Sequence, residues 1–129
     1  MRVEKLLPSK YGYSNAAIAG GRLAFIAGQI AEDQHGNFVG RDDFASQTRQ
    51  VFSNLRAILS DLNAVPDDVV KLNYYIIGLA SDRLAAVRVA RDALFASPRK
   101  PASTLVGVEV LFKPEALIEV EMIVDLPLI

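Results

Sequence analysis

The chain has no cysteine and only one histidine, His35, among its 129 residues. The absence of cysteine excludes disulfide bonds and thiolate chemistry, and one histidine cannot build the His/Cys cluster that a zinc site requires. His35 lies within residues 33–37, which have the composition of a turn, so its side chain is expected to face water. We therefore predict no metal site and no catalytic histidine.

The chain also lacks an excess of charge of either sign, and it lacks long apolar runs. The net charge is −1 and there is no long basic run, which excludes the electrostatic footprint of a nucleic-acid-binding protein. Residues 1–14 contain no sustained apolar segment, and no stretch approaches the ~20 apolar residues of a membrane span. We expect a soluble, cytoplasmic protein with neither a nucleic-acid partner nor a membrane partner.

What the sequence does contain is ample apolar material for a core. Hydrophobic residues make up 51% of the chain, and a chain of this length fits one domain. No internal repeat, low-complexity tract or linker divides it. We predict a single domain over residues 1–129.

The clearest strand pattern lies near the C-terminal end. It indicates two strands, residues 102–111 and 117–124, which we expect to pair as a hairpin. Period-2 alternation places Glu119 and Glu121 together on one face of the second strand, with Val120 on the other. Two interpretations remain open for these carboxylates: a solvent-facing edge, or a cleft in which partial desolvation lets one of them handle a proton.

The N-terminal part of the chain predicts an edge strand followed by a β-hairpin. The edge strand covers residues 1–6. The hairpin joins residues 16–19 to residues 23–30 through Gly20-Gly21, because two adjacent glycines supply the positive φ values of a tight turn.

After the hairpin the apolar period becomes helical. Apolar residues at helical spacing over residues 44–62 predict an amphipathic helix of about five turns. Asp42 or Asp43 can cap its start, and the helix must end before Pro66, because proline cannot continue the hydrogen-bond ladder. Residues 69–79 follow as a strand rich in β-branched and aromatic residues.

A second helix over residues 84–95, capped by Ser81 or Asp82, completes the pattern. The predicted order is ββ(β)αβαββ, an α+β fold with one mixed six-stranded sheet. Right-handed crossovers place both helices on one face of this sheet. Residues 23–27 and 74–77 are apolar on both alternating faces, so we expect another copy of the chain to cover the other face.

Several short motifs occur in a consistent order along nearly the whole chain. They are Gly12-Tyr13-Ser14, Ala27-Gly28-Gln29-Ile30, Gln47-x-Arg49-Gln50-x3-Asn54-Leu55, Val69-Val70-Lys71, Phe95, Pro101-Ala102 and Ile118-Glu119-Val120-Glu121. With these motifs the chain resembles the Rid family of reactive-intermediate deaminases, also called YjgF-like or liver perchloric-acid-soluble proteins. The resemblance implies a chorismate-mutase-like fold and a homotrimer whose ligand clefts lie between subunits.

The resemblance also implies an activity. Active members hydrolyse enamines and imines released by pyridoxal-phosphate enzymes to 2-oxo acids and ammonia, and they need no cofactor of their own. By position, Tyr13 would line the cleft, the backbone around Gly28 would bind substrate or water, and Glu121 would handle the proton. Glu119 would be the neighbour of Glu121.

One position departs from the family pattern. Family deaminases carry an arginine after Pro-Ala that holds the substrate carboxylate by two parallel hydrogen bonds, and this chain has Ser103 there. A hydroxyl offers one neutral donor, so activity on 2-aminoacrylate is expected to be low, and Ser103→Arg is expected to raise it. The cations that can substitute are Arg99, Lys100 and Arg88. Arg88 would share the cleft with Glu121, or else be a solvated helix residue.

Two functions therefore stay open. The first is an enamine or imine deaminase with a rearranged anion site. The second is a non-catalytic trimer that binds small carboxylates. Ribonuclease activity, attributed to some relatives, has no support here, because the chain has no histidine pair and no basic groove.

Overall fold

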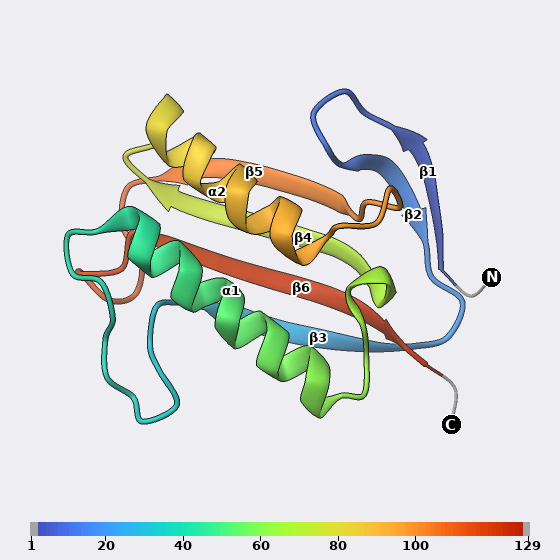
Figure 1. Cartoon of the computed structure of the whole chain (residues 1–129), viewed down its shortest axis with the longest axis horizontal. Coiled ribbons are helices and arrows are strands. Elements are labelled where there is room, and N and C mark those ends of the chain that lie inside the picture. The colour runs from blue at the N-terminus through green and yellow to red at the C-terminus, as the bar shows by residue number, and fades with distance from the viewer. Residues whose placement is uncertain (1–2, 128–129) are drawn as a thin grey trace.

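The computed structural model describes residues 3–127, which form a mixed six-stranded sheet with two helices against it (Figure 1). The elements are β1 Glu4–Pro8, β2 Ser14–Ile18, β3 Arg22–Gln29, α1 Phe44–Asp61, the 3-10 turn η1 Pro66–Asp68, β4 Val69–Ile77, α2 Ser81–Leu94, β5 Ala102–Val108 and β6 Ile118–Leu126. Their order is the predicted one, and the α+β class is confirmed. Of the edge strand predicted over residues 1–6, the first two residues lie outside the described part.

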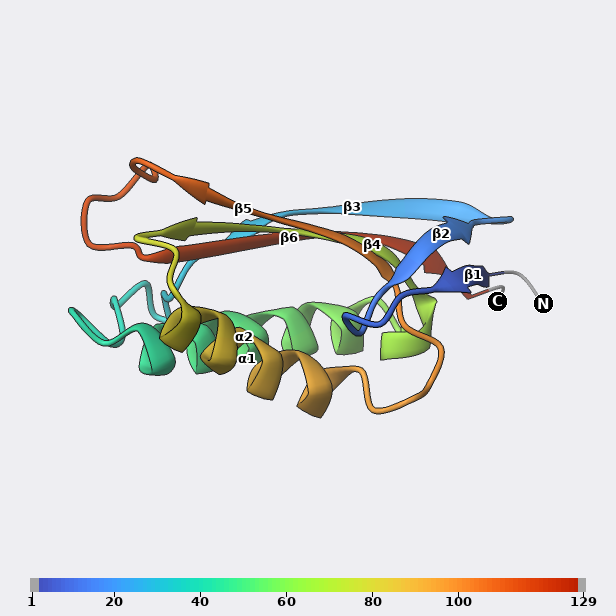
Figure 2. The same cartoon turned by 90° about the horizontal axis from the view of Figure 1, so that it is seen from above.

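The sheet has the strand order β1-β2-β5-β4-β6-β3. β4 runs parallel to β5 and antiparallel to β6, and β6 runs antiparallel to β3. Each helix therefore connects two parallel strands, which favours the same side of the sheet for both helices. Figure 2 shows both helices on one side, as predicted. We call the opposite side the free face; it carries Phe25, Asn73, Tyr75, Glu119 and Glu121.

The core lies between the helices and the sheet. The even-numbered residues of β6 from 118 to 124 are at most 1% exposed and belong to the core, which confirms their predicted face. From α1, Val51 and Leu55 are fully buried against them. Burial of an apolar side chain of this size stabilises the fold by roughly 1.5–3 kcal/mol. The same alternation turns the carboxylates of β6 toward the free face.

The two helices begin in different ways. Asp43 caps α1, because its carboxylate accepts the backbone N–H of Ser46 at 3.1 Å. The predicted caps of α2, Ser81 and Asp82, are wrong: both lie inside its first turn, and Ala80 precedes them without a side-chain cap. Asp82 instead places a negative charge at the positive end of the helix dipole. Within the described residues, no helix is long and apolar enough to cross a membrane.

Both predicted hairpins are wrong. β4 lies between β5 and β6, so the two C-terminal strands do not pair with each other. β2 pairs with β1 and, at a single residue pair, with β5, while β3 pairs with β6 at the other end of the sheet. Figure 1 shows the chain passing from β2 across the end of the sheet to β3.

The Gly20-Gly21 link has a different role from the one predicted. Neither glycine has a positive φ. Their N–H groups donate to the carboxylate of Asp125 at 2.7 and 3.1 Å, and Asp125 is fully buried on β6. The link is therefore held by a charge-assisted pair of hydrogen bonds, not by a hairpin turn.

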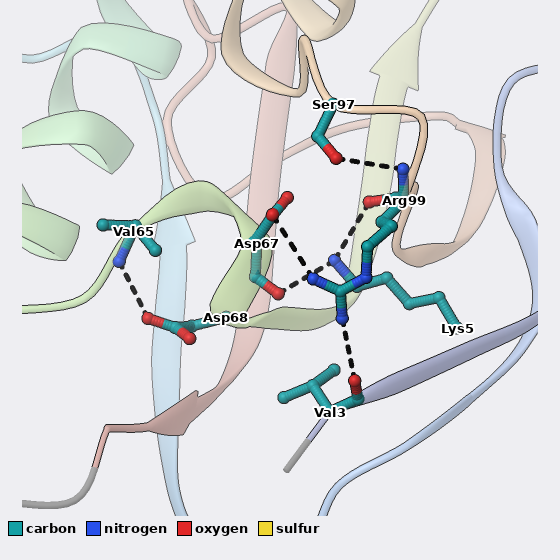
Figure 3. Close-up of polar contacts among 7 residues, drawn as sticks. All are labelled: Val3, Lys5, Val65, Asp67, Asp68, Ser97 and Arg99. Atoms are coloured by element: carbon teal, nitrogen blue, oxygen red, sulfur yellow. Dashed lines mark hydrogen bonds and ion pairs between the residues drawn. The ribbon is translucent and has the colours of Figure 1, made fainter. Parts of the chain in front are cut away.

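A polar cluster, which we call the Lys5 cluster, attaches the edge strand β1 to the rest of the fold (Figure 3). The Nζ of Lys5 donates to the carbonyl oxygens of Asp67 and Arg99 at 3.0 and 3.2 Å. The Arg99 guanidinium contacts the Asp67 carboxylate at 3.3 Å and donates to the carbonyl of Val3 at 2.8 Å. β1 is thus joined to η1 and to the segment that leads into β5.

Candidate functional site

A pocket of about 900 Å³ opens between α2, β5 and the loop from β1 to β2. We call it the α2–β5 pocket; it is lined by Lys10, Tyr11, Gly12, Tyr13, Tyr74, Leu84, Val87, Arg88, Arg91, Asp92, Lys100, Ser103, Thr104 and Leu105. β2 bonds to β5 only at Ser14 and Ala102, and the loop before β2 lines one side of the pocket. Its volume lies in the range of small-molecule sites.

The charge of the α2–β5 pocket is strongly positive. Four cationic side chains line it, against one acidic side chain, Asp92. Arg91 contacts Asp92 at 3.0 Å and donates to the carbonyl of Tyr11 at 3.0 Å. Lys100 donates to the carbonyl of Phe95. The pocket is therefore suited to an anionic ligand.

Two cationic side chains of the α2–β5 pocket, Arg88 and Lys10, have neither a hydrogen bond nor an ion pair with a described residue. Lys10 only approaches the ring of Tyr11, at 5.2 Å. Both side chains belong to exposed residues. Three cations were expected to substitute for the arginine that family deaminases carry at the position of Ser103. Arg88 and Lys100 line the pocket, whereas Arg99 contacts Asp67 in the Lys5 cluster.

The floor of the pocket contains an unusual polar group. Tyr74 is 2% exposed, its ring stacks on Phe52 with centroids 6.3 Å apart, and its hydroxyl has no hydrogen-bond partner among the described residues. Burial raises the pKa of Tyr74 well above its ordinary value, with smaller effects from Arg91 and Asp92. The hydroxyl therefore stays protonated and is an available donor.

A second group of candidate site residues, which includes two carboxyl groups, lies on the free face. The β3–β6 register shifts between Ile26 and Gln29, so Gly28 lies in a bulge. A Cβ atom at Gly28 would lie 1.9 Å from the Oε2 of Glu119. The Glu119 carboxyl therefore occupies space that only a glycine leaves, and bulges of this kind often aim side chains at sites.

Glu121 has a different environment from Glu119. It accepts hydrogen bonds from the Tyr75 hydroxyl at 2.5 Å and from the Asn73 amide at 3.2 Å. The bond to Glu121 raises the pKa of Tyr75, because only the protonated phenol can donate to the carboxylate. Glu121 also borders a small depression of about 130 Å³ with Phe25 and Lys71.

Glu119, the neighbour of Glu121 on β6, differs from an ordinary carboxyl in its pKa. Desolvation raises the pKa of Glu119, and the charge of Glu121 raises it further. A carboxylate whose pKa is raised is a stronger base than an ordinary one, so it accepts a proton more readily. Glu119 is therefore a candidate proton carrier beside Glu121, the residue that the resemblance implies.

The structure brings together some of the predicted site residues and separates others. Tyr13, Arg88 and Ser103 line the α2–β5 pocket on the helix side of the sheet. Gly28 and Glu121 lie at the free face. Arg88 and Glu121 do not share a cleft within one chain, because they lie on opposite sides of the sheet. Their expected cleft between subunits stays a prediction.

Sequence reasoning did not select Lys10, Tyr74 or Arg91, which are among the residues that line the α2–β5 pocket. Arg91 could have been found from the sequence. It lies three residues after Arg88, which was already a candidate, and residues three apart on a helix share a face. Tyr74 could not, because alternation predicts that it is buried but not that its hydroxyl lacks a partner. His35 is exposed in its turn, as predicted.

Comparison with known proteins gives a consistent family. The sequence model of the endoribonuclease L-PSP family matches residues 4–126. A RutC family protein of Pyrococcus abyssi is 34% identical over 116 residues, which cover 90% of this chain and 88% of the relative. A 2-iminobutanoate/2-iminopropanoate deaminase of Dermatophagoides farinae is 30% identical over 119 residues, which cover 92% of this chain and 90% of the relative.

Solved structures agree with the sequence relatives. The Rid family protein YyfB of Yersinia pestis, whose function is described as unknown, has a TM-score of 0.90 and 34% identity, covering 98% of this chain and all of that one. Rv2704 of Mycobacterium tuberculosis, from the YjgF/YER057c/UK114 family, has a TM-score of 0.65 and 26% identity, covering 96% of this chain and 99% of that one. The chorismate-mutase-like fold is thereby confirmed.

Proposed function

Because the chain belongs to the endoribonuclease L-PSP family, which includes the Rid and RutC proteins, we propose that it hydrolyses imines of small carboxylic acids. The products are a 2-oxo acid and ammonia. One observation carries this proposal: Glu119, a half-buried carboxyl with a raised pKa, lies against the side-chain-free backbone of Gly28. The name of the Dermatophagoides farinae relative, an imine deaminase, points the same way.

The α2–β5 pocket is the proposed place of the substrate carboxylate. Its surplus of cationic side chains attracts anions, and Arg88 is exposed and available for a two-pronged hydrogen bond. Ser103 adds one hydroxyl donor, and Tyr13 contributes an aromatic wall. In this proposal the anion site has moved from β5, where family deaminases place an arginine, to α2.

The proposed chemistry needs only a positioned water and one proton carrier. Glu119 accepts a proton from water while the water oxygen bonds to the carbon of the protonated imine. Glu119 then returns this proton to the nitrogen, and the C–N bond breaks. The remaining hydroxyl proton passes to the departing ammonia, so the imine and water become a 2-oxo acid and ammonium. Proton transfer by a positioned side chain contributes about 10²- to 10⁴-fold in rate.

The α2–β5 pocket and Glu119 lie on opposite faces of one chain, so the proposal requires assembly. We propose a homotrimer in which the α2–β5 pocket of one copy meets Gly28 and Glu119 of the next. The free face supports this, because Phe25 is 74% exposed there and a covering copy would bury it. No cofactor takes part in the proposed reaction.

A second candidate is a trimer that binds carboxylates without turning them over. Ser103 is the observation that favours it, because a single neutral hydroxyl holds a carboxylate less tightly than a guanidinium does. This candidate keeps the α2–β5 pocket and assigns no proton transfer to Glu119.

The decisive experiment measures ammonia and 2-oxo acid release from freshly generated 2-aminoacrylate and 2-iminobutanoate. We expect acceleration by the wild-type protein, weak on these short substrates and raised by Ser103→Arg. Glu119→Gln should lower kcat by about 10²-fold or more with little change in KM, since only the proton carrier is lost. The control Glu4→Gln, on the exposed edge strand β1, should behave as wild type.

The outcomes separate the two candidates. Carboxylate binding with no acceleration of any imine would support the non-catalytic trimer. Full activity in Glu119→Gln would show that another group carries the proton.

A further inference from the structure

The unengaged polar groups of the α2–β5 pocket share one property: they are hydrogen-bond donors. Arg88 and Lys10 are cations without an ion-pair partner among residues 3–127. Tyr74 presents a protonated hydroxyl that no described residue accepts. The acidic member of the lining, Asp92, is already paired with Arg91. A ligand that satisfies this pocket must therefore be rich in acceptors and carry more than one negative charge.

These donors lie at different depths. Arg88 and Lys10 are exposed at the rim, whereas Tyr74 is 2% exposed on the central strand β4. Apolar side chains of Val87 and Leu105 lie in the same lining. One small carboxylate bound at the rim leaves the buried hydroxyl unpaired, while an acid with a second carboxylate can supply acceptors at both depths.

A ligand reaches the Tyr74 hydroxyl only if groups that cover it move, because this hydroxyl is buried. The long side chains in the same lining include Arg91 and Lys100, which donate to the carbonyls of Tyr11 and Phe95. Pairing a buried orphan hydroxyl recovers the desolvation already incurred on folding, which corresponds to about tenfold or more in affinity.

Resting on the function proposed above, we infer that the preferred substrates are imines of dicarboxylic acids. Arg88 and Lys10 hold one carboxylate at the rim, and the Tyr74 hydroxyl donates to the second carboxylate at the floor. The volume of about 900 Å³ leaves room for such an elongated dianion. Tyr74 is then the residue that determines specificity, since it distinguishes a second acceptor from an alkyl group.

The test compares the stable 2-oxo acids that the two substrate classes would yield. Isothermal titration calorimetry of the full-length protein uses 2-oxoglutarate as the dicarboxylate and 2-oxobutanoate as the monocarboxylate. We expect 2-oxoglutarate to bind at least about tenfold more tightly, because it engages both depths. Tyr74→Phe should weaken 2-oxoglutarate about tenfold and leave 2-oxobutanoate unchanged. Arg88→Gln should weaken both ligands.

Controls keep the result interpretable. Arg49→Gln changes an exposed arginine on α1, outside the α2–β5 pocket, and should leave both affinities unchanged. Tyr74→Phe should unfold at the same denaturant concentration as wild type or higher, since it removes only an unpaired hydroxyl. If that variant fails to fold, the ratio of the two wild-type affinities still decides.

Equal wild-type affinities, or a Tyr74→Phe variant that keeps the preference, would overturn the inference. If 2-oxobutanoate binds and its imine is hydrolysed without any preference for the dicarboxylate, the proposed function stands and the inference alone fails. If neither acid binds and no imine is hydrolysed, both fail together.

Discussion

Glu119 and Glu121 lie two residues apart on β6 and yet have different surroundings. Tyr75 and Asn73 donate to Glu121, which holds its carboxylate in place. Glu119 has the raised pKa and the contact with Gly28. One additional methyl group at position 28 would enter the space of this carboxyl, which makes Gly28 the most informative single position of the free face.

Gly28→Ala is therefore predicted to act through Glu119. The new Cβ would lie 1.9 Å from the Oε2 of Glu119, so the flexible carboxyl must rotate away. Gly28 has no positive φ, so alanine fits the backbone. We expect imine hydrolysis to fall about as far as in Glu119→Gln, roughly 10²-fold, while the free energy of unfolding changes by less than about 1 kcal/mol. Ammonia release and urea unfolding measure the two effects.

A matched glycine controls for this effect. Gly107 also lies on a strand without positive φ, and its Cβ would meet Leu79 at 3.3 Å, away from both carboxylates of β6. Gly107→Ala should keep activity. Equal activity in Gly28→Ala and wild type would contradict the placement of the proton carrier at Glu119.

At this scale the sequence predicts side-chain direction better than side-chain partners. Alternation along β6 correctly separated Val120 from Glu119 and Glu121, because the period of a strand is fixed by its backbone. It could not distinguish the two glutamates, since their difference comes from β3 and β4, which are distant in sequence. For the same reason the unpaired hydroxyl of Tyr74 could not be foreseen.

At the scale of elements, the helices and strands were predictable and their pairing was not. The spacing of apolar residues along the sequence correctly located α1, β4 and β6, because each of them buries one continuous apolar side. The pairing of β2 with β3 was expected from their short link, but pairing depends on long-range partners. β4, inserted between β5 and β6, and the buried Asp125 that binds the Gly20-Gly21 link were both invisible to local reasoning.

The Lys5 cluster makes the attachment of β1 dependent on pH. Desolvation lowers the pKa of Lys5 to about 8; Asp67 opposes this shift, Arg99 adds to it, and Asp68 opposes it weakly. An unfolded lysine titrates near 10.5, so between these values the unfolded chain binds more protons than the folded chain. The free energy of unfolding should therefore gain a contribution that rises with pH from about 8 to 10.5.

Lys5→Met is expected to remove this contribution. Urea unfolding should be measured at several pH values from about 7.5 to about 10, which cover the titration of Lys5. The free energy of unfolding of the wild type should increase relative to that of the variant as the pH rises. Lys10→Met, at an exposed lysine of the β1–β2 loop, should keep the wild-type dependence. Parallel curves for wild type and Lys5→Met would contradict the role of Lys5.

For the whole molecule, the central question is what covers the free face. Both helices lie on the other side of the sheet, so nothing within residues 3–127 packs over Phe25. The sequence already indicated this, because residues 23–27 are apolar on both alternating faces. A surface that combines exposed apolar side chains with half-buried carboxylates is suited to a symmetric partner, which would bury the former and complete a site with the latter.

We accordingly predict a trimer that depends on Phe25. Sedimentation velocity at micromolar concentration should give roughly three times the mass of one chain, and Phe25→Glu should shift it toward the monomer, since an unpaired charge at an apolar interface is strongly unfavourable. Val65→Glu is the control: Val65 is also exposed but lies between α1 and η1, outside both the free face and the α2–β5 pocket, and should leave the mass unchanged. Imine hydrolysis should fall with the mass in Phe25→Glu, because the α2–β5 pocket of one copy then loses Glu119 of the next. A wild-type monomer that hydrolyses imines would contradict both the assembly and the shared site.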